Sequence, residues 1–290
     1  MTRTPKPPRA AANPPCPHAM SDLSDLSDLS DLASWQAYGG SVVGADHRRS
    51  GRCNQDAWHL QRSERAVIGV VADGCGSAPH SEVGAWLGAR IWTHTLAQLL
   101  DEGPHPIQPT DPELWSRACA RSLDRLAALV NTLPGSSAAI VHEALLFTLV
   151  GFVLTPTQLV VHAIGDGVVW LDGQRTELGP FADNRPPYLA YGLHGPTPPV
   201  TIIHAVAPAS VECLIVATDG ATQLRGDIPL AQFAAPRYLA HPHAITRQLA
   251  QLNRERLEID WSAEYVERSH GQLADDTTLL VLGRAPGRPA

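Results

Sequence analysis

From Trp35 onward, the pattern of apolar and polar positions changes repeatedly between the period of a strand and the period of a helix. Nine short runs, rich in β-branched and aromatic residues, have the length and composition of strands. They cover residues 35–44, 56–61, 65–73, 144–154, 158–166, 167–173, 200–207, 212–220 and 277–284. These runs predict a protein built mainly on β-sheets.

Three further segments have the spacing of helices. Between residues 81 and 100, apolar side chains recur every three or four positions. Asp111 followed by Pro112 is typical of a helix start, and we expect this second helix to end near residues 131–134. A third helix is predicted over residues 242–258.

The order of these elements favours antiparallel sheets over a parallel α/β fold. The runs at 144–154, 158–166 and 167–173 are joined by connections of a few residues, which suit antiparallel neighbours. Strands come in blocks separated by helices, instead of alternating with them one by one. We therefore expect an α+β protein, with antiparallel sheets that carry helices on their faces.

Composition and charge narrow the functional classes. The 290 residues are 44% hydrophobic, which is enough for a large core, and the net charge of -7 with no basic cluster argues against nucleic acid as a partner. The five cysteines are scattered without a CxxC pair, which predicts no disulfide framework and no thiolate zinc site and favours the reducing cytoplasm. The longest apolar run, 144–154, is about half the ~20 residues of a membrane span, so we expect no membrane insertion.

The N-terminal segment differs from the rest of the chain. Residues 1–33 contain six prolines followed by the repeat SDLSDLSDLSDL, whose apolar stripe is too narrow to build a core. We predict a disordered leader at 1–33, one domain at 34–285 and a short tail at 286–290. A docking peptide is the alternative function for the leader, and Met20 is an alternative start of the protein.

Carboxylates recur at the ends of the predicted strands. Asp73, Asp166 and Asp219 each close an apolar run and are followed by glycine, while Asp275 precedes the last run and Asp56 lies beside an early one. Each Asp-Gly pair alone is at least as typical of a hairpin turn as of a site. If the strands share one sheet edge, these acids converge, and carboxylates within about 5 Å of each other repel strongly unless a cation lies between them. Oxygen ligands without thiolate or histidine favour Mg²⁺ or Mn²⁺.

Five segments in order resemble the metal-dependent protein phosphatases (PPM, type 2C), and specifically a bacterial branch of that family. They are RCNQDA at 52–57, VADGCGSAPHSEVGA at 71–85, AIGDGVVWL at 163–171, VATDG at 216–220 and DDTTLLVL at 275–282. The resemblance implies a four-layer α/β/β/α sandwich of two antiparallel sheets flanked by helix pairs. It also implies two Mn²⁺ or Mg²⁺ ions in the cleft between the sheets, with a weaker third site.

The resemblance also implies roles for individual residues. The catalytic set comprises Asp73, Asp219, Asp275 and Arg52. Asp73 would bridge both metals, the Gly74 carbonyl would bind one of them, and Asp219 and Asp275 would bind the other. Asp56 and Glu82 would hold metal-bound water, and Asp166 would belong to the third metal site. Asp276 stands at a position that is often Asn in the family.

Two departures from the family pattern affect the expected chemistry. The phosphate-binding Arg of the family is expected at position 51, which is Gly51 here; Arg52 is the nearest replacement, with Arg49 or His47 as alternatives, and a surface role for all three stays open. Eukaryotic members often have His where this chain has Cys75. A core-facing thiol is the favoured interpretation of Cys75, since no HCxxxxxR cradle surrounds it.

The predicted function is therefore a Mn²⁺- or Mg²⁺-dependent phosphatase that removes phosphate from phosphoserine and phosphothreonine in proteins by attack of metal-activated water. Its partners would be phosphoproteins made by a Ser/Thr kinase. The alternative is a catalytically weak pseudophosphatase that binds a phosphoprotein or a regulatory partner. Residues 173–199, rich in Pro and Gly, are either a flap that selects the phosphopeptide or a simple connection.

Overall fold

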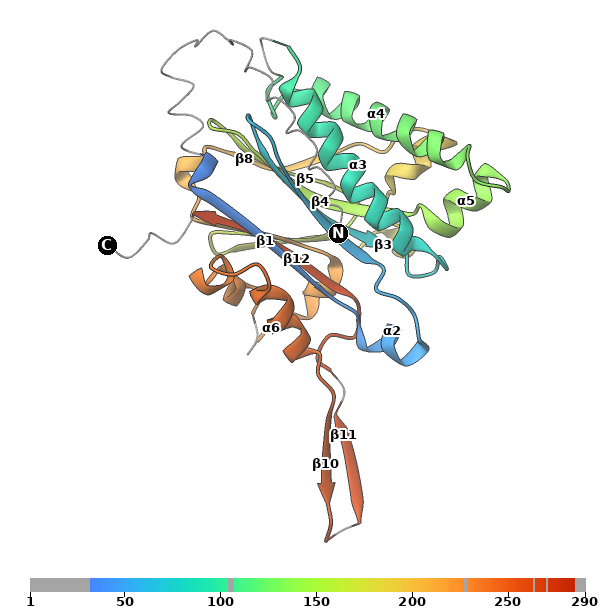
Figure 1. The fold of residues 1–290 in the computed structure, drawn as a ribbon, viewed down its shortest axis with the longest axis vertical. Coiled ribbons are helices and arrows are strands. Elements are labelled where there is room, and N and C mark those ends of the chain that lie inside the picture. The colour runs from blue at the N-terminus through green and yellow to red at the C-terminus, as the bar shows by residue number, and fades with distance from the viewer. Residues whose placement is uncertain (1–31, 104–106, 227–228, 263, 270, 285–290) are drawn as a thin grey trace, which may run out of the picture.

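Two five-stranded antiparallel sheets lie face to face in the computed structural model (Figure 1), which describes residues 32–103, 107–226, 229–262, 264–269 and 271–284. The sheet that we call the β1 sheet has the order β1 (Trp35–Val42), β12 (Thr277–Arg284), β9 (Cys213–Ala217), β6 (Gly167–Leu171) and β7 (Gln174–Leu178). The β3 sheet has the order β2 (Asp56–Arg62), β3 (Val67–Gly74), β4 (Phe147–Leu154), β5 (Leu159–Ile164) and β8 (Thr201–Val206). The expected two-sheet α+β architecture is confirmed.

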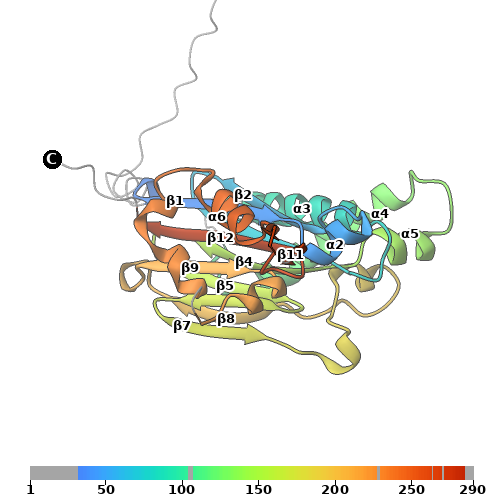
Figure 2. The ribbon, with the colours of Figure 1, turned by 90° about the horizontal axis from the view of Figure 1, so that it is seen from below.

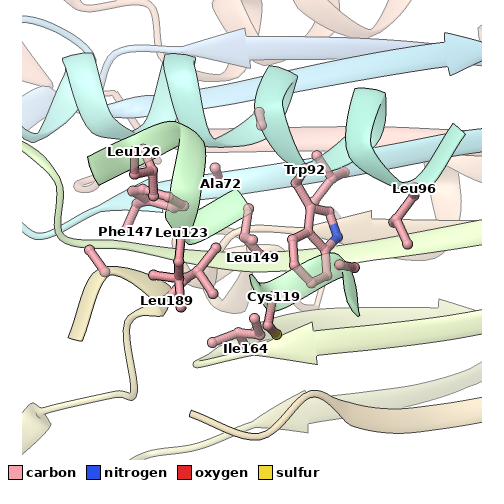
Figure 3. Close-up of a cluster of buried hydrophobic side chains, with 14 of the residues drawn as sticks. Ala72, Trp92, Leu96, Cys119, Leu123, Leu126, Phe147, Leu149, Ile164 and Leu189 are labelled. Atoms are coloured by element: carbon pink, nitrogen blue, oxygen red, sulfur yellow. The ribbon is translucent and has the colours of Figure 1, made fainter. Parts of the chain in front are cut away.

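Helices α3 (Ser81–Asp101) and α4 (Pro112–Val130) cover the outer face of the β3 sheet (Figures 1 and 3), with the short α5 (Ser137–Ala144) beside them. Asp111 caps α4 by accepting a hydrogen bond from the N–H of Glu113. Trp92 and Leu96 of α3 and Leu126 of α4 are fully buried against this face. Burying such side chains stabilises the fold by about 1.5–3 kcal/mol each.

The two faces of β3 belong to different cores. Ile68 and Val70 pack under the helices, whereas Val67 and Val71 pack in the layer between the two sheets. Because successive residues of a strand point to opposite faces, Asp73 follows Val71 into the layer between the sheets. The strand period therefore aims this carboxylate at the space between the sheets, where the sheets end.

The outer face of the β1 sheet is covered differently. In the described part of the chain, one α-helix, α6 (Ala244–Leu252), packs there together with the 3-10 helices η5 (Leu230–Ala234) and η6 (Pro236–Tyr238). Ile245 and Leu249 of α6 are fully buried in this third core. The helix pair expected on this side is thus replaced by one α-helix and short 3-10 turns.

The predicted helix at 242–258 is wrong in its second half. After α6 ends at Leu252, the chain forms the hairpin β10 (Arg256–Asp260) and β11 (Tyr265–Ser269), which projects from the body in Figure 1 and is seen nearly end on in Figure 2. Leu257 and Ile259 alternate with acidic residues, which is the strand period. Alternation over five residues at the end of a helical pattern was the missed signal.

The short connection after β5 does not join paired strands. β5 belongs to the β3 sheet, whereas β6 begins in the β1 sheet after only two connecting residues. Gly165 and Gly167, with φ of 96° and 144°, allow the chain to cross between the sheets here. Asp166 lies between these glycines, so it is held where the two sheets meet.

Two further expectations concern the ends of the chain and the membrane. Residues 1–31 of the predicted leader and the tail at 286–290 lie outside the described residues, whereas Leu32 packs into the layer between the sheets. None of the described helices has the length and apolar character needed to cross a bilayer. The four described cysteines, which are Cys53, Cys75, Cys119 and Cys213, form no disulfide.

Candidate active site

An acidic pocket of about 140 Å³ opens at the end of the layer between the sheets. Its acidic lining residues are Asp73, Asp166, Asp219, Asp275 and Asp276, and Gly74 also lines it. A larger groove of about 530 Å³ lies between α4 and residues 197–202, and no carboxylate or histidine lines it. The acids expected at the strand ends, Asp73, Asp166, Asp219 and Asp275, therefore line the smaller pocket.

Local structure explains why acids from distant segments meet here. Asp56 at the start of β2 lies directly opposite Asp73 at the end of β3, so both point to the same face of the β3 sheet. Asp219 begins the 3-10 helix η4 (Asp219–Gln223) directly after the buried strand β9, and Asp275 lies two residues before β12. β9 and β12 are neighbours in the β1 sheet, which brings their ends together on the opposite side of the cleft.

Electrostatic repulsion in this cluster is strong. Burial raises the pKa of Asp73 well above its ordinary value, and the charges of Asp56 and Asp219 raise it further. Asp73 and Asp219 come from different sheets, yet both line the same pocket. A cation bound next to Asp73 would therefore stabilise its ionised carboxylate strongly, because it offsets both the burial and the neighbouring negative charges.

The neighbouring acids respond in the same way. Burial raises the pKa of Asp56, although the Thr218 hydroxyl donates a hydrogen bond of 2.7 Å to its Oδ2 and opposes the shift. Burial, together with the charge of Asp219, raises the pKa of Asp166 to about 6. Burial also raises the pKa of Asp275, with a further contribution from Asp219.

The donor set suits a hard divalent cation. It consists mainly of carboxylate oxygens and the backbone of Gly74, and the pKa values of Asp73, Asp166 and Asp275 are raised; Cys75 and His47 also line the pocket. A Cβ atom at Gly74 would lie 2.7 Å from the Gln55 carbonyl oxygen and 2.8 Å from that of Ser81. Only glycine fits this position, so the backbone beside Asp73 can approach an ion closely.

Asp276 differs from the other acids because both of its oxygens are already occupied. Oδ1 accepts the N–H of Gly44 at 2.6 Å, and Oδ2 accepts the N–H of Gln55 at 2.6 Å and Nδ1–H of His47 at 2.8 Å. His47, Asp275 and Asp276 are close enough to form a possible three-ligand metal group. The hydrogen bonds of Asp276 instead make it a clamp that joins the segment before α2 (Ala45–Ser50), the start of β2 and the start of β12.

Arg52 lies beside the pocket but is not among its lining residues. Its guanidinium donates to the carbonyl oxygens of Gly76 at 2.6 Å and Ala78 at 2.8 Å, so it holds the loop that follows Gly74. Arg49 is paired with Asp46 on the surface. Of the three basic residues considered for phosphate binding, His47 alone lines the pocket.

Several lining residues were missed by the sequence analysis. Thr148 lies opposite Asp73 in the strand pairing, and Asn184 and Tyr188 come from the Pro/Gly-rich segment 173–199. That segment thus forms one wall of the pocket. Burial raises the pKa of Tyr188, and its hydroxyl is hydrogen-bonded to Cys75. The family pattern places variation in this segment, so no sequence signal singled out these two side chains.

Cys75 is half-buried at the pocket and has an unusual environment. Burial favours the neutral thiol, but hydrogen bonds from Ser77, Tyr188 and the backbone outweigh it and bring the pKa of Cys75 below its ordinary value. The side chain of Cys75 packs against the core under the helices, as expected, and also lines the pocket. Glu82, in the first turn of α3, has its carboxylate 4.0 Å from Nδ1 of His80 and does not line the pocket.

A sandwich of two antiparallel sheets with an acid-lined pocket at the end of the layer between them is the arrangement of the metal-dependent phosphatases of the type 2C fold. The family model for protein phosphatase 2C matches residues 43–257. The chain therefore belongs to the protein phosphatase 2C family, whose members are metal-dependent protein phosphatases. No curated protein sequence matches the chain significantly.

Solved structures agree with the fold. Stp1, a serine/threonine phosphatase from Staphylococcus aureus, is 14% identical with a TM-score of 0.55, over 86% of this chain and 95% of that one. A bacterial serine phosphatase is 14% identical with a TM-score of 0.53, over 88% and 99% of the two chains. The catalytic domain of the phosphatase PstP, in complex with two manganese ions, is 16% identical with a TM-score of 0.50, over 87% and 99%. At these identities the likeness shows the fold alone.

Proposed function

We propose that this chain hydrolyses phosphoserine and phosphothreonine esters in proteins with the help of divalent cations bound in the acidic pocket. The observation that carries the proposal is that Asp73 and Asp219, which come from different sheets, line the same small pocket, where the charge of Asp219 raises the pKa of Asp73. A scaffold without catalysis has no reason to retain such repulsion. PstP, a structure of similar fold, is described with two manganese ions, which supports two sites here.

The residues of the chain would divide the work as follows. Asp73 would bridge two ions, Gly74 would offer a carbonyl oxygen, and Asp219 and Asp275 would complete the set, with Asp166 available for a third ion. When bound, Mn²⁺ or Mg²⁺ supplies a water of lowered pKa and neutralises the charge that grows on the phosphoryl oxygens. Asp56 would orient that water, since Thr218 fixes one of its carboxylate oxygens.

The binding of the substrate phosphate is the part of the site that differs from the expected family pattern. No Arg or Lys lines the pocket in the described part of the chain, so the phosphate would meet His47 and the cations first. Arg52 stays a candidate for phosphate binding only if it exchanges its bonds to Gly76 and Ala78 for bonds to phosphate. The lack of an Arg or Lys at the pocket among the described residues is the observation in favour of the second candidate function, a weak pseudophosphatase that binds phosphoproteins.

Phosphatase activity distinguishes the two functions. Release of p-nitrophenol from p-nitrophenyl phosphate and of phosphate from a phosphoserine peptide would be measured with Mn²⁺, with Mg²⁺ and with EDTA. We expect turnover with either metal, none with EDTA, and a large loss in Asp219→Asn. Wild-type protein that binds Mn²⁺ but releases no phosphate from either substrate would identify the pseudophosphatase.

The physiological setting follows from the proposed chemistry. A phosphoprotein phosphatase acts on the products of a Ser/Thr kinase, which we propose as the source of its substrates in the cytoplasm. The wall formed by Asn184, Pro186 and Tyr188 stands where a peptide backbone would pass the pocket. We propose that this wall selects among phosphopeptides. Replacement of residues 173–199 by a short linker without any change in phosphopeptide preference would contradict this.

A further inference from the structure

The hairpin formed by β10 and β11 stands apart from the two sheets. Its strands pair with each other and with neither five-stranded sheet among the described residues. Its apolar side chains are mostly in solvent, and the exposed fractions are 58% for Leu257, 49% for Ile259, 83% for Trp261, 59% for Tyr265 and 55% for Val266. Isolated two-stranded hairpins are marginally stable in water, so this exposure calls for a partner.

The two faces of the hairpin differ in chemistry. The register pairs Leu257 with Arg268 and Ile259 with Val266, and residues paired in this way share a face. The opposite face pairs Glu258 with Glu267 and Asp260 with Tyr265. One face therefore presents three apolar side chains with Arg268, and the other presents three acids with Tyr265. Oδ1 of Asp260 also accepts hydrogen bonds from the N–H and the hydroxyl of Ser262. β10 alternates Leu, Glu, Ile and Asp along one edge.

The base of the hairpin is bonded to the segment around α2, and His47 of α2 lines the acidic pocket. The N–H of Gln272 donates to the Leu252 carbonyl, which closes the hairpin, and Asn253 bonds to the Val43 carbonyl at 2.7 Å and to Arg48 at 2.5 Å. Gln272 is three residues from Asp275, which is about 10 Å of extended chain. β10 adds about 17 Å beyond that base. A segment bound along β10 would thus begin about three extended residues from the pocket, and its far end would lie roughly eight extended residues away.

We propose that the outer edge of β10 binds an extended segment of the phosphoprotein substrate by β-strand addition. The side chains of an added strand alternate between the two faces of the sheet, so the segment that fits alternates apolar residues with Lys or Arg. Its apolar residues lie beside Leu257 and Ile259, and its basic residues lie beside Glu258 and Asp260. This inference rests on the proposed function, because it assigns the occupant to the substrate.

A second copy of the chain fits the hairpin less well. The exposed apolar side chains amount to a few hundred Å², which is below the roughly 800 Å² per partner of a stable interface. Two copies would also bring their acidic faces together, and like charges directly opposite each other are unfavourable. The same acids disfavour an anionic lipid surface. The negative charge and the small apolar area of the hairpin therefore favour a basic peptide segment that binds transiently, as a substrate does.

The test uses phosphoserine peptides of 20 residues with identical sequences around the phosphate. Between about three and eight residues away they carry Val-Lys-Val-Lys-Val, Val-Glu-Val-Glu-Val or a Gly/Ser arm. We expect kcat/KM of the wild-type protein to be about tenfold higher for the Val-Lys arm than for the Gly/Ser arm. The preference should be lost in Leu257→Lys/Ile259→Lys and reversed toward the Val-Glu arm in Glu258→Lys/Glu267→Lys.

Matched controls separate peptide binding by the hairpin from the proposed phosphatase activity. Leu133→Lys changes an apolar side chain of similar exposure, 54%, outside the hairpin and should keep the preference. Turnover of p-nitrophenyl phosphate should be equal in all of these proteins. Equal kcat/KM for the three arms, or a preference that survives the hairpin substitutions, would overturn the inference while leaving the phosphatase intact.

Binding is measured independently of catalysis. Fluorescence anisotropy of the unphosphorylated Val-Lys arm peptide should show binding to the wild-type protein and a loss of at least tenfold in Leu257→Lys/Ile259→Lys. The anisotropy measurement tests the hairpin even if no substrate is hydrolysed. In that case only the proposed phosphatase function would be refuted. A substrate role would be refuted if the peptide does not bind and the wild-type protein instead forms dimers in sedimentation analysis or binds vesicles. Loss of the dimers or of vesicle binding in the hairpin variant would then assign the hairpin to that occupant.

Discussion

Asp56 and Asp73 face each other directly across two antiparallel strands, so two carboxylates share one face at the mouth of the cleft. Like charges placed in this way destabilise a sheet in proportion to their burial. The energy is recovered when a cation binds, because the ion is attracted to the same charges that repel each other. The site is therefore built at a cost to the metal-free fold.

Asp73→Asn should stabilise the metal-free protein and remove its activity. The substitution takes away one buried charge next to Asp56 and Asp219, so the Tm in EDTA should rise, whereas the increase of Tm on adding Mn²⁺ should largely disappear. Loss of the bridging ligand should lower kcat/KM by about a thousandfold or more. Differential scanning fluorimetry and phosphatase assays measure these effects. Asp124→Asn, on the exposed side of α4, should change none of them.

The stability of the metal-free protein should fall as the pH rises from about 4 to about 6. Asp166 has a folded-state pKa of about 6, above its unfolded value, so the folded state holds this proton more tightly and loses the advantage as the proton leaves. The raised pKa values of Asp56, Asp73 and Asp275 act in the same direction. Urea unfolding in EDTA at pH 4.5, 5.5 and 7.5 tests this, and a stability that increases over this range would contradict it.

Mn²⁺ binding should depend on pH in the opposite sense. Protons and cations compete for the same carboxylates, so Mn²⁺ affinity should fall by about tenfold per pH unit below pH 6 for each proton displaced. Isothermal titration calorimetry in buffers of different ionisation enthalpy would measure both the affinity and the protons released. Binding without proton release at pH 5.5 would mean that the acids are ionised before the metal arrives.

The sequence alone predicted the sheets and the position of the acids because both follow from short-range patterns. The strand period sets which face Asp73 points to, and Asp-Gly pairs mark where the strands end. The convergence of Asp219 and Asp275 could be expected only on the condition that their strands share one sheet edge, because it depends on the pairing of β9 with β12. Such long-range pairing leaves no local signal.

Other features could not be predicted because they depend on tertiary contacts. Asp276 was expected at a position often filled by Asn, yet its three hydrogen bonds to Gly44, His47 and Gln55 come from segments more than 200 residues away in the sequence. The lining residues Asn184 and Tyr188 come from a segment without periodic pattern. The hairpin after α6 was missed because its strand alternation is only five residues long and directly follows a helical pattern.

Asp276→Ala should destabilise the protein by about 3–5 kcal/mol, since it leaves several buried donors without an acceptor. Asp276→Asn keeps one acceptor oxygen and should cost less, about 1–3 kcal/mol. Urea unfolding in EDTA separates this effect from metal binding. If both variants unfold like the wild-type protein, Asp276 is not the clamp that its hydrogen bonds indicate.

Tyr188→Phe should raise the pKa of the Cys75 thiol, because it removes a hydrogen bond that favours the thiolate. The pH at which iodoacetamide alkylates Cys75 at half its maximal rate should therefore increase. Peptide mass spectrometry distinguishes Cys75 from the exposed Cys53. Tyr191→Phe, which changes the neighbouring ring, is the matched control and should leave the alkylation profile of Cys75 unchanged.

Gly74→Ala and Gly76→Ala provide a comparison within one loop. A Cβ at Gly74 would lie 2.7 Å and 2.8 Å from two backbone oxygens, so the backbone must shift, whereas a Cβ at Gly76 meets nothing within 4 Å. Gly74→Ala should cost about 1–3 kcal/mol in urea unfolding and weaken Mn²⁺ binding, because the shift moves the carbonyl next to Asp73. Gly76→Ala should unfold like the wild-type protein or be slightly more stable, since alanine restricts the unfolded chain. Equal effects of the two substitutions would show that the close approach at Gly74 does not limit the site.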